Sequence, residues 1–557
     1  MMRRRIPLIL VLVLLVTPAP TAAATATHRP SIRTATDVGL AAPININSIL
    51  PIVNNQSVSN AQVIADLYPP LLSIGHKITI RWRQSLARSI RVTDHDTHFW
   101  IRLRHWKWSD GRPITAAEVA YSFTLMRDFG PRYLNYSIGG IPMVVRRVRL
   151  LGPHRLLVVT HHPVNPRWFE LNGLTQFQAL PRFAWKGLSV DELYNEQTEP
   201  SLVRVVDGPY RLAKFVLGRE VVLVRNPAYS GPPGHFHRLV YAMYTSSEGA
   251  FWALRSGHLD IGNVPHALYR ARGLLRHMKS CITNGGFGIN YIVLNFVNPR
   301  VAFFHELALR RALEYAINQK LMIRVAFNGF GTPGFSPVPG SPPTYLSPLL
   351  RRLTDHPSLM YRPNHARALL RSLGWRRRPG RGWVRRNRAG VPLRFTMLFP
   401  SGSRTQIIVA DIIKQEWEKI GVDVRLRQIP FNLLLAKLEV PHGHWSAALI
   451  AWDYEPDYYP TGEGLFNTHG GTNYGHYSNP TLDRLIRATN VEPGRAPLYA
   501  YERFMMRHLP VLFVPLQGNL VKYRAGLSLR AVDSTLYHVA CVPPSRVKRV
   551  DSPSPSR

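Results

Sequence analysis

The sequence predicts an α/β protein assembled from interleaved segments. Several short stretches alternate apolar and polar residues, which is the period of half-buried strands, and others space apolar residues three or four apart, as amphipathic helices do. Of 557 residues, 45% are hydrophobic, so the chain can bury large cores. Its length indicates about three or four domains, and no repeat of solenoid period is present.

The first clear strand is predicted at residues 99–104, where apolar side chains occupy the odd positions. The apolar phase then shifts to Trp106 and Trp108, which indicates a bulge. Thr115 and Glu118 have the spacing of a capping box and predict the start of a helix. We expect this region to be scaffold.

Further elements are predicted toward the C-terminus. A hairpin is expected over residues 208–227, and a strand over 422–426, from alternating apolar residues on each side of turn residues. Helical spacing, C-terminal glycines and a first-turn proline predict helices at residues 307–320, 365–373 and 407–420 and from Asn479 onward.

The N-terminus predicts export. Three arginines lie within residues 1–5, an aliphatic run follows over 6–16, and small residues fill 18–26. This is the composition of a secretory signal peptide ending near residue 26. A membrane anchor is the alternative, but the apolar run is shorter than the ~20 residues that span a bilayer. We therefore expect a mature protein that is soluble and periplasmic.

The chain is strongly basic. Removing the three arginines of residues 1–5 lowers the formal charge only from +37 to +34. Such an excess often indicates nucleic acid binding, but export, the even spread of arginines and the lack of a binding motif argue against it. Adaptation to an acidic exterior is a second interpretation. The densest arginine cluster, residues 376–388, brackets Pro379 and Gly380 and predicts a solvated hairpin or loop.

Cys281 and Cys541 are the two cysteines, and neither lies at the expected cleavage point. The mature protein is therefore not expected to carry a lipid anchor. An oxidising compartment would allow one long-range disulfide. Two buried thiols are an equally good interpretation, since sequence does not report the distance between them.

Motifs for catalysis are missing from the sequence. Residues 329–334 match a dinucleotide-binding glycine pattern, but they follow a helix and precede a proline-rich stretch, so the strand-to-helix context is absent. No phosphate-binding loop, nucleophile elbow or zinc-binding helix motif occurs. Histidine pairs at 161–162, 235/237 and 442/444 could offer imidazoles, but a closed metal site needs three or four ligands. We expect no enzyme, metal or cofactor.

The richest group of functional side chains lies at residues 445–459. Trp452, Asp453 and Tyr454 follow an apolar strand, and Trp445 precedes it. Carboxylates and aromatic rings at the end of a core strand suit a ligand with an ammonium group and apolar parts. The alternative is a turn with solvated acids and packing aromatics.

In this order, several segments of the chain resemble the family 5 extracellular solute-binding proteins, receptors for oligopeptides, dipeptides and nickel in ABC import. The matching segments are residues 99–123, 208–231, 309–320, 368–375, 406–426 and 452–485. The resemblance spans about residues 40 to 540. Asn318 stands where relatives often have aspartate, which we interpret as a difference in helix capping.

The resemblance implies a two-lobed clamshell of the type II, cluster C-like periplasmic binding proteins, with an extra subdomain in lobe I. Lobe I would comprise residues 27–60, 206–281 and 515–557, its subdomain 61–205, and lobe II 282–514. A short peptide would lie between the lobes as an extended strand. Closure would then present a surface to the permease subunits of an ABC importer, with the receptor acting as a monomer.

The resemblance also assigns a ligand site. In peptide-binding relatives an aspartate near a tryptophan holds the ligand's α-ammonium, and Asp453 matches that position. Trp452, Tyr454 and Trp445 would supply aromatic contacts, although Trp452 is adjacent to the aspartate where relatives set the tryptophan back. If the compartment is acidic, Asp453 would need a depressed pKa to stay charged. No arginine can be assigned to the ligand's carboxylate.

Other functions remain open at this stage. Within binding proteins, the ligand could be a nickel or other metal chelate, a sugar or another small solute, because fold does not fix ligand. A periplasmic chaperone or a signalling receptor could use the same clamshell. An exported hydrolase would need a nucleophile with a base within reach, and the sequence shows none.

Overall fold

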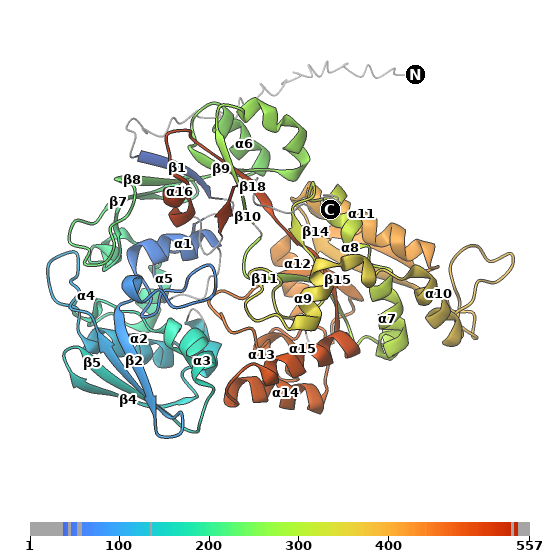
Figure 1. The fold of residues 1–557 in the computed structure, drawn as a ribbon, viewed down its shortest axis with the longest axis horizontal. Helices are drawn as coiled ribbons and strands as arrows, with labels where there is room; N and C mark the ends of the chain where they lie inside the picture. The colour runs from blue at the N-terminus through green and yellow to red at the C-terminus, as the bar shows by residue number, and fades with distance from the viewer. Residues whose placement is uncertain are drawn as a thin grey trace, which may run out of the picture.

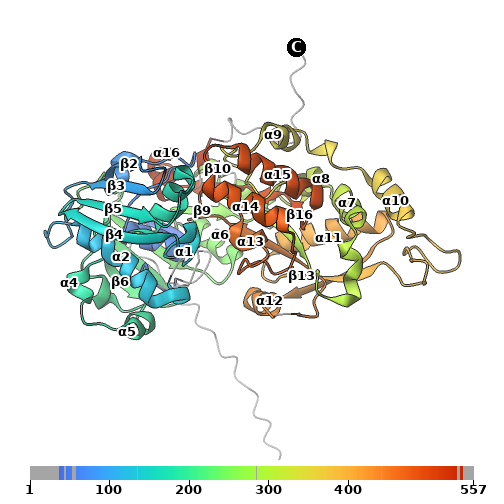
Figure 2. The same ribbon diagram turned by 90° about the horizontal axis from the view of Figure 1, so that it is seen from below.

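A computed structural model describes most of the chain. The described residues are 37–42, 46–52, 58–133, 136–283, 285–440, 442–535 and 540–543. The expected signal peptide, residues 1–26, lies outside them. The molecule is elongated, with the N-terminal third of the chain at one end and the helices of the C-terminal half at the other (Figures 1 and 2).

An eight-stranded sheet collects segments from both ends of the chain. Its order is β19-β10-β18-β9-β1-β8-β7-β6. The strands are β1 (Asp37–Ala42), β6 (Tyr210–Val216), β7 (Glu220–Arg225), β8 (Arg238–Met243), β9 (Ile261–Val264), β10 (Lys279–Thr283), β18 (Asn519–Tyr523) and β19 (Cys541–Val542). The antiparallel pair of β6 and β7 confirms the predicted hairpin. Helices α1 (Val58–Leu67), α6 (Ser247–Arg255) and α16 (Leu529–Thr535) lie near it.

A separate four-stranded antiparallel sheet forms one end of the molecule. Its order is β2-β3-β5-β4, made of β2 (Ala87–Thr93), β3 (His98–Leu103), β5 (Arg155–Thr160) and β4 (Val145–Gly152). One face packs into the core with α2 (Ala116–Phe129). The capping box is confirmed, since Glu118 accepts a 2.9 Å hydrogen bond from the Thr115 amide.

The predicted bulge after residues 99–104 is wrong. Strand β3 ends at Leu103, and the following residues form an irregular segment. Trp106 and Trp108 are 5% and 0% exposed, so both are core residues of that segment. The change of phase therefore marks the end of a strand and not an extra residue within it.

The third sheet has five strands in the order β14-β13-β15-β11-β16. These are β11 (Gly288–Leu294), β13 (Arg394–Pro400), β14 (Asp423–Ile429), β15 (Ala447–Asp453) and β16 (Val511–Val514). The accompanying helices are α7 (Leu307–Tyr315), α8 (Gln319–Val325), α9 (Pro348–Asp355), α10 (Pro363–Ser372), α11 (Arg404–Lys419), α12 (Phe431–Leu438), α13 (Glu463–Phe466), α14 (Pro480–Val491) and α15 (Ala496–His508).

Most predicted helix ends are confirmed. Gly374 and Gly421 have φ of 84° and 89°, a conformation that favours glycine after a helix. Asn479 caps α14. The single helix expected at 307–320 is instead two, because Asn318 caps α8 by accepting a 3.0 Å hydrogen bond from the Leu321 amide. This confirms a capping role for Asn318.

Two adjacent crossovers connect the eight-stranded and five-stranded sheets. One leads from β10 to β11 and the other from β16 to β18 through β17 (Leu516–Gln517), which pairs with β12 (Gly331–Thr332). Gly285, with φ of 74°, lies in the first crossover. A Cβ there would sit 2.3 Å from the Gln517 carbonyl oxygen, so glycine allows the two crossovers to touch.

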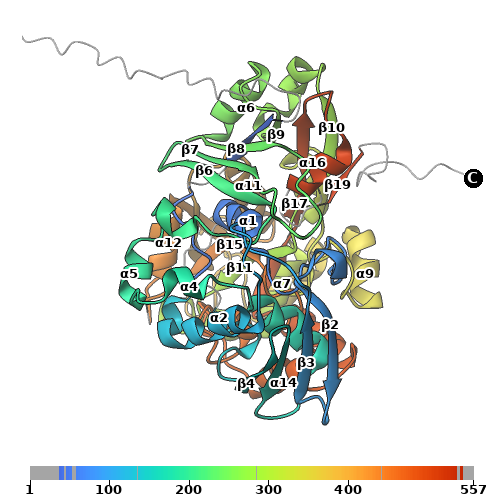
Figure 3. The ribbon, with the colours of Figure 1, turned by 90° about the vertical axis from the view of Figure 1, so that its left-hand side faces the viewer.

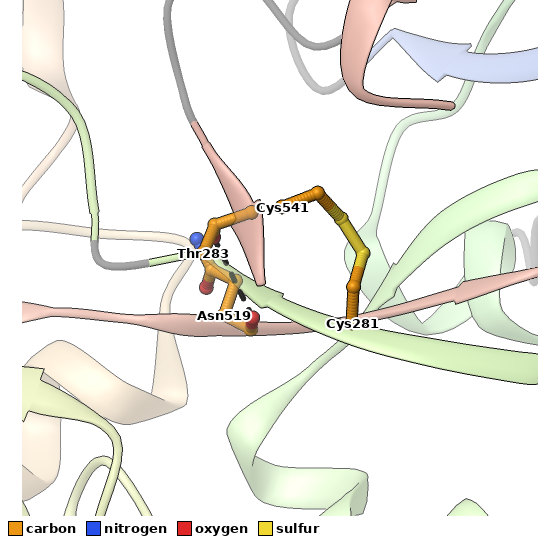
Figure 4. The surroundings of a disulfide bond; sticks show 4 residues. All are labelled: Cys281, Thr283, Asn519 and Cys541. Carbon is orange, nitrogen blue, oxygen red and sulfur yellow. Dashed lines mark hydrogen bonds between the residues drawn. A yellow bond between two sulfur atoms is a disulfide. The ribbon is translucent and has the colours of Figure 1, made fainter. Parts of the chain in front are cut away.

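A disulfide joins Cys281 and Cys541 (Figure 4), with the two Cα atoms 5.4 Å apart. This resolves the choice between a disulfide and two thiols. It links β10 to β19, while Thr283 on β10 pairs with Asn519 on β18. The bond therefore attaches the C-terminal segment to the strand that enters the first crossover.

The arginine cluster at 376–388 forms a loop that projects beyond α10 (Figure 2). Arg376, Arg377 and Arg381 are exposed, as predicted for a solvated loop. Arg385 is not solvated: it is 6% exposed and donates to the carbonyls of Ile420 and Trp375 at 2.7 and 2.9 Å. The guanidinium of Arg385 thus joins the base of the loop to the residues that follow α10 and α11.

Candidate functional site

The predicted site lies at the C-terminal end of β15, beside the crossovers (Figure 1). Asp453 is the last residue of the strand and pairs with Gly288 of β11. Residues 447 to 450 of β15 are buried, whereas Ala451 and Asp453 are both exposed. Since alternate residues of a strand share a face, these two point to the same solvent-accessible side.

Gly286 leaves the carboxylate of Asp453 uncovered, and Gly288 allows the backbones of β11 and β15 to approach closely. A Cβ on Gly286 would lie 3.5 Å from Asp453 Oδ2, and one on Gly288 would lie 2.4 Å from the Trp452 carbonyl oxygen. The small side chain at Ala451 adds to the open space. A ligand group could therefore approach the carboxylate of Asp453 from the side of the first crossover.

Asp453 combines access with desolvation. Burial by the surrounding protein raises its pKa to about 6, while the Glu455 amide, which donates to Oδ1 at 3.1 Å, opposes that shift. Within the described residues no cation pairs with it. The depressed pKa expected for an acidic compartment is therefore not found, because no positive charge in the ligand-free protein stabilises the ionised form.

The neighbouring aromatic residues are placed differently from one another. Trp452 is partly buried, and its indole Nε1 is shielded from solvent without a hydrogen-bond partner. Tyr454 is 1% exposed, and its hydroxyl donates to the Pro337 carbonyl at 2.6 Å. Trp445 precedes β15, so a strand of 7 residues, about 20 Å long, separates it from Asp453. The ligand contacts of these three residues stay predictions.

Two further carboxyls follow Asp453. Glu455 has one shielded oxygen without a partner, and burial, followed by the charge of Asp453, raises its pKa well above the usual range. Asp457 accepts from the Asn172 side-chain amide, and burial also raises its pKa well above the usual range. Of the three side chains, Asp453 is exposed to solvent, whereas Glu455 and Asp457 are partly buried.

Asn172 connects the four-stranded-sheet region to the segment after β15. Its side chain donates to the Tyr459 carbonyl at 2.9 Å and accepts from the Tyr459 amide at 2.6 Å. Gln176 adds a 3.5 Å hydrogen bond to the Pro456 carbonyl. Sequence reasoning missed both residues, since neither belongs to a motif and their partners are far away in the chain.

The described residues contain no group of three or more metal-ligating side chains. What the site offers is one accessible, desolvated carboxyl beside aromatic rings, residue types that suit a cation and apolar groups. It stands where two lobes meet: the eight-stranded and four-stranded sheets on one side, the five-stranded sheet on the other. Fold and site together define a two-lobed solute-binding protein.

The comparison with protein families agrees with this class. The model described as "Bacterial extracellular solute-binding proteins, family 5 Middle" matches residues 81–475. The chain belongs to this family of extracellular solute-binding proteins. Family members bind substrates and are not enzymes, and they are periplasmic or extracellular. No helix in the described part combines the length and apolar character needed to cross a membrane.

Individual relatives include two oligopeptide-binding proteins. The chain is 22% identical to the oligopeptide-binding protein AppA of Bacillus subtilis over 76% of this chain and 74% of AppA. It is 26% identical to the periplasmic oligopeptide-binding protein OppA of Salmonella typhimurium, over 71% of each chain.

Two solved structures share the fold. AppA from Bacillus subtilis in complex with a nonapeptide superposes with a TM-score of 0.69 at 18% identity, covering 88% of this chain and 94% of AppA. NikA from Brucella suis in complex with Fe(III)-EDTA gives a TM-score of 0.72 at 18% identity, covering 88% and 95%. These likenesses confirm the two-lobed α/β architecture.

Proposed function

We propose that the protein is the periplasmic receptor of an ABC importer and captures short peptides through their free α-ammonium group at Asp453. The observation that carries this proposal is the accessible carboxyl at the end of β15, which no cation in the described chain neutralises. An ammonium ion would supply the missing charge and form a charge-assisted hydrogen bond. The oligopeptide-binding relatives support the same ligand class.

The proposed path of the peptide follows from the crossovers. Ala451 and Gly286 keep the space next to Asp453 free of side chains. A peptide that starts at Asp453 could extend between the lobes with its backbone in strand conformation. Peptide contacts with Trp452, Tyr454 and Trp445 belong to this proposal as well.

The proposed lobes follow the three sheets. Lobe I would consist of residues 27–60, 206–281 and 515–557, supported by an eight-stranded sheet drawn from those segments. Its subdomain would be 61–205, the region of the four-stranded sheet, and lobe II would be 282–514. Closure of the lobes on a peptide would then present the monomer to the permease.

The test compares two variants with the same charge change. Asp453→Asn should weaken binding of a free-amine peptide by about 2 kcal/mol or more, the scale for removing one partner of a buried charge pair. Asp411→Asn, on the exposed side of α11, should leave it unchanged. Titration calorimetry with a peptide and its N-acetylated form measures both effects.

The outcomes separate the candidate functions. Binding that needs a free amine and Asp453 supports the proposal. Equal binding of the acetylated peptide removes the role of Asp453 but keeps a peptide receptor. Binding of a metal chelate or a sugar, with no response to peptides, would transfer the function to that ligand class while the fold stands.

A further inference from the structure

The outer face of the four-stranded sheet carries a recess that the proposed function does not use. It has a volume of about 580 Å³ and is lined by residues of all four strands of that sheet, with Asp94 beside them. Small-molecule sites occupy about 300 to 1,000 Å³. Figure 3 views the molecule from the end where this sheet lies. The opposite face of the sheet packs into the core, so the recess opens on the solvated side.

Three exposed arginines line the recess without partners. Arg102 of β3 and Arg155 of β5 are direct cross-strand neighbours, and Arg91 of β2 lies opposite Trp100. In the part of the chain that the structure describes, no ion pair or hydrogen bond engages their guanidinium groups. Like charges directly opposite each other destabilise a sheet. A bound anion would remove this repulsion between Arg102 and Arg155.

Trp100 provides a flat apolar surface next to these charges. Its side chain is 40% exposed, and its Nε1 donates to Thr93 Oγ1 at 2.9 Å, which fixes the orientation of the ring. Of the residues that line the recess, Asp94 carries the one carboxylate. That group is already engaged, since it accepts from Thr93 at 3.2 Å and lies 3.3 Å from His98 Nδ1.

We propose that this recess binds an acidic saccharide. A carboxylate, sulfate or phosphate substituent lies between Arg102 and Arg155, whose planar guanidinium groups match such anions. The apolar face of a sugar ring packs on Trp100. Sites for single-stranded nucleic acid align successive aromatic side chains, whereas this recess has one aromatic residue, so a single ring with an anionic substituent is the better match.

The test uses an oligogalacturonate, its methyl-esterified neutral form and single-stranded DNA as probes of the full-length protein. The acidic oligosaccharide should bind, and the neutral ester about tenfold more weakly, the scale of one charge-assisted hydrogen bond. Arg102→Ser/Arg155→Ser and Trp100→Ala should each weaken binding about tenfold, corresponding to about 1.4 kcal/mol.

Matched variants come from the loop that follows α10. Arg377→Ser/Arg381→Ser removes the same charge, and Trp383→Ala removes a tryptophan that is 41% exposed, close to the 40% of Trp100. Both should leave binding unchanged. The melting temperature of Arg102→Ser/Arg155→Ser without ligand should be unchanged or higher, because a repulsive pair is lost. This result would exclude misfolding as the cause of weaker binding.

Several results would overturn the proposal. They are an absence of oligogalacturonate binding, equal binding of the ester, equal weakening by the loop variants, or tighter binding of DNA than of the oligosaccharide. Competition between the oligosaccharide and a peptide would also overturn it, since the two sites are on different parts of the molecule. Failure of peptide binding alone would affect the proposed function and not this recess.

Discussion

Two groups of desolvated carboxyls differ in their access to solvent. Asp66 is a partly buried residue of α1 that bonds Tyr241 of the eight-stranded sheet, and Asp207 lies just before β6, whereas Asp453 ends β15 at the crossovers. Asp207 is 1% exposed and neither of its oxygens has a hydrogen-bond partner, while Asp453 is exposed. Burial raises the pKa in both groups. A raised pKa alone therefore does not distinguish the two groups, whereas exposure to solvent does.

The closed group is built as neutral scaffold. The Tyr241 hydroxyl donates to Asp66 at 2.7 Å, and burial raises the pKa of Asp66 to about 7. Asp207 precedes Gly208, where a Cβ would lie 2.2 Å from the Asp66 carbonyl oxygen. The chain from Asp207 onward thus packs directly on the end of α1. A protonated carboxyl suits this position because ionisation there would leave a charge without a partner.

Of the substitutions that test the difference between the two groups of carboxyls, Asp207→Asn should have the largest effect. Because burial raises its pKa, the folded protein holds the proton more tightly, and stability is lost as pH rises through the folded pKa. Asparagine cannot ionise, so the free energy of unfolding should rise by about 2 kcal/mol at pH 8 and stay unchanged at about pH 3, below the ordinary aspartate pKa of 3.8.

Urea unfolding at both pH values measures this difference. Asp453→Asn serves as the comparison and should raise stability at pH 8 by clearly less than Asp207→Asn does, because the Asp453 side chain is exposed and water screens the effect of its raised pKa. A similar gain for both variants would show that the two groups do not differ. A loss of stability for Asp207→Asn at both pH values would mean that the aspartate has a structural partner in solution.

The sequence predicted the open group better than the closed one. Acids and aromatics after an apolar strand marked Asp453, and β15 indeed ends there. Nothing marked Asp207 as buried, because its burial depends on α1, which the local pattern around residue 207 does not report. Local signals of this kind also explain why the caps at Thr115 and Asn479 could be predicted.

Long-range contacts set the limits of prediction at the site. Asn172 and Gln176 reach the segment after β15 from a different sheet region, so no spacing rule connects them. The aromatic content of residues 445–459 suggested one cluster, yet β15 separates Trp445 from Asp453. Strand geometry gives that separation only once the strand is known. The partner-free arginines of the outer sheet likewise became visible only through cross-strand register.

The pH dependence of peptide binding gives the second largest effect. An ammonium ligand needs the ionised carboxylate, and the pKa of Asp453 in the ligand-free protein is about 6. Affinity should therefore be constant between that pH and the ~7.7 pKa of a free α-amino group, and fall about tenfold per pH unit below pH 6, until the lower pKa of the bound carboxyl is reached. Titration calorimetry from pH 4 to 8 measures the profile. Asp207→Asn should keep it, and a flat profile in the unaltered protein would exclude Asp453 from the site.

Gly286→Ala tests access itself and has the smallest expected effect. The added methyl group would lie 3.5 Å from Asp453 Oδ2, an ordinary contact that needs no movement of the backbone. It would cover part of the carboxylate, so affinity for a free-amine peptide should fall about fivefold, or about 1 kcal/mol, with the melting temperature unchanged.

Gly471→Ala is the matched control, since a Cβ there meets nothing within 4 Å. Unchanged affinity in Gly286→Ala would mean that the ligand reaches Asp453 from another side, and the distinction between open and closed carboxyls would then rest on Ala451 alone.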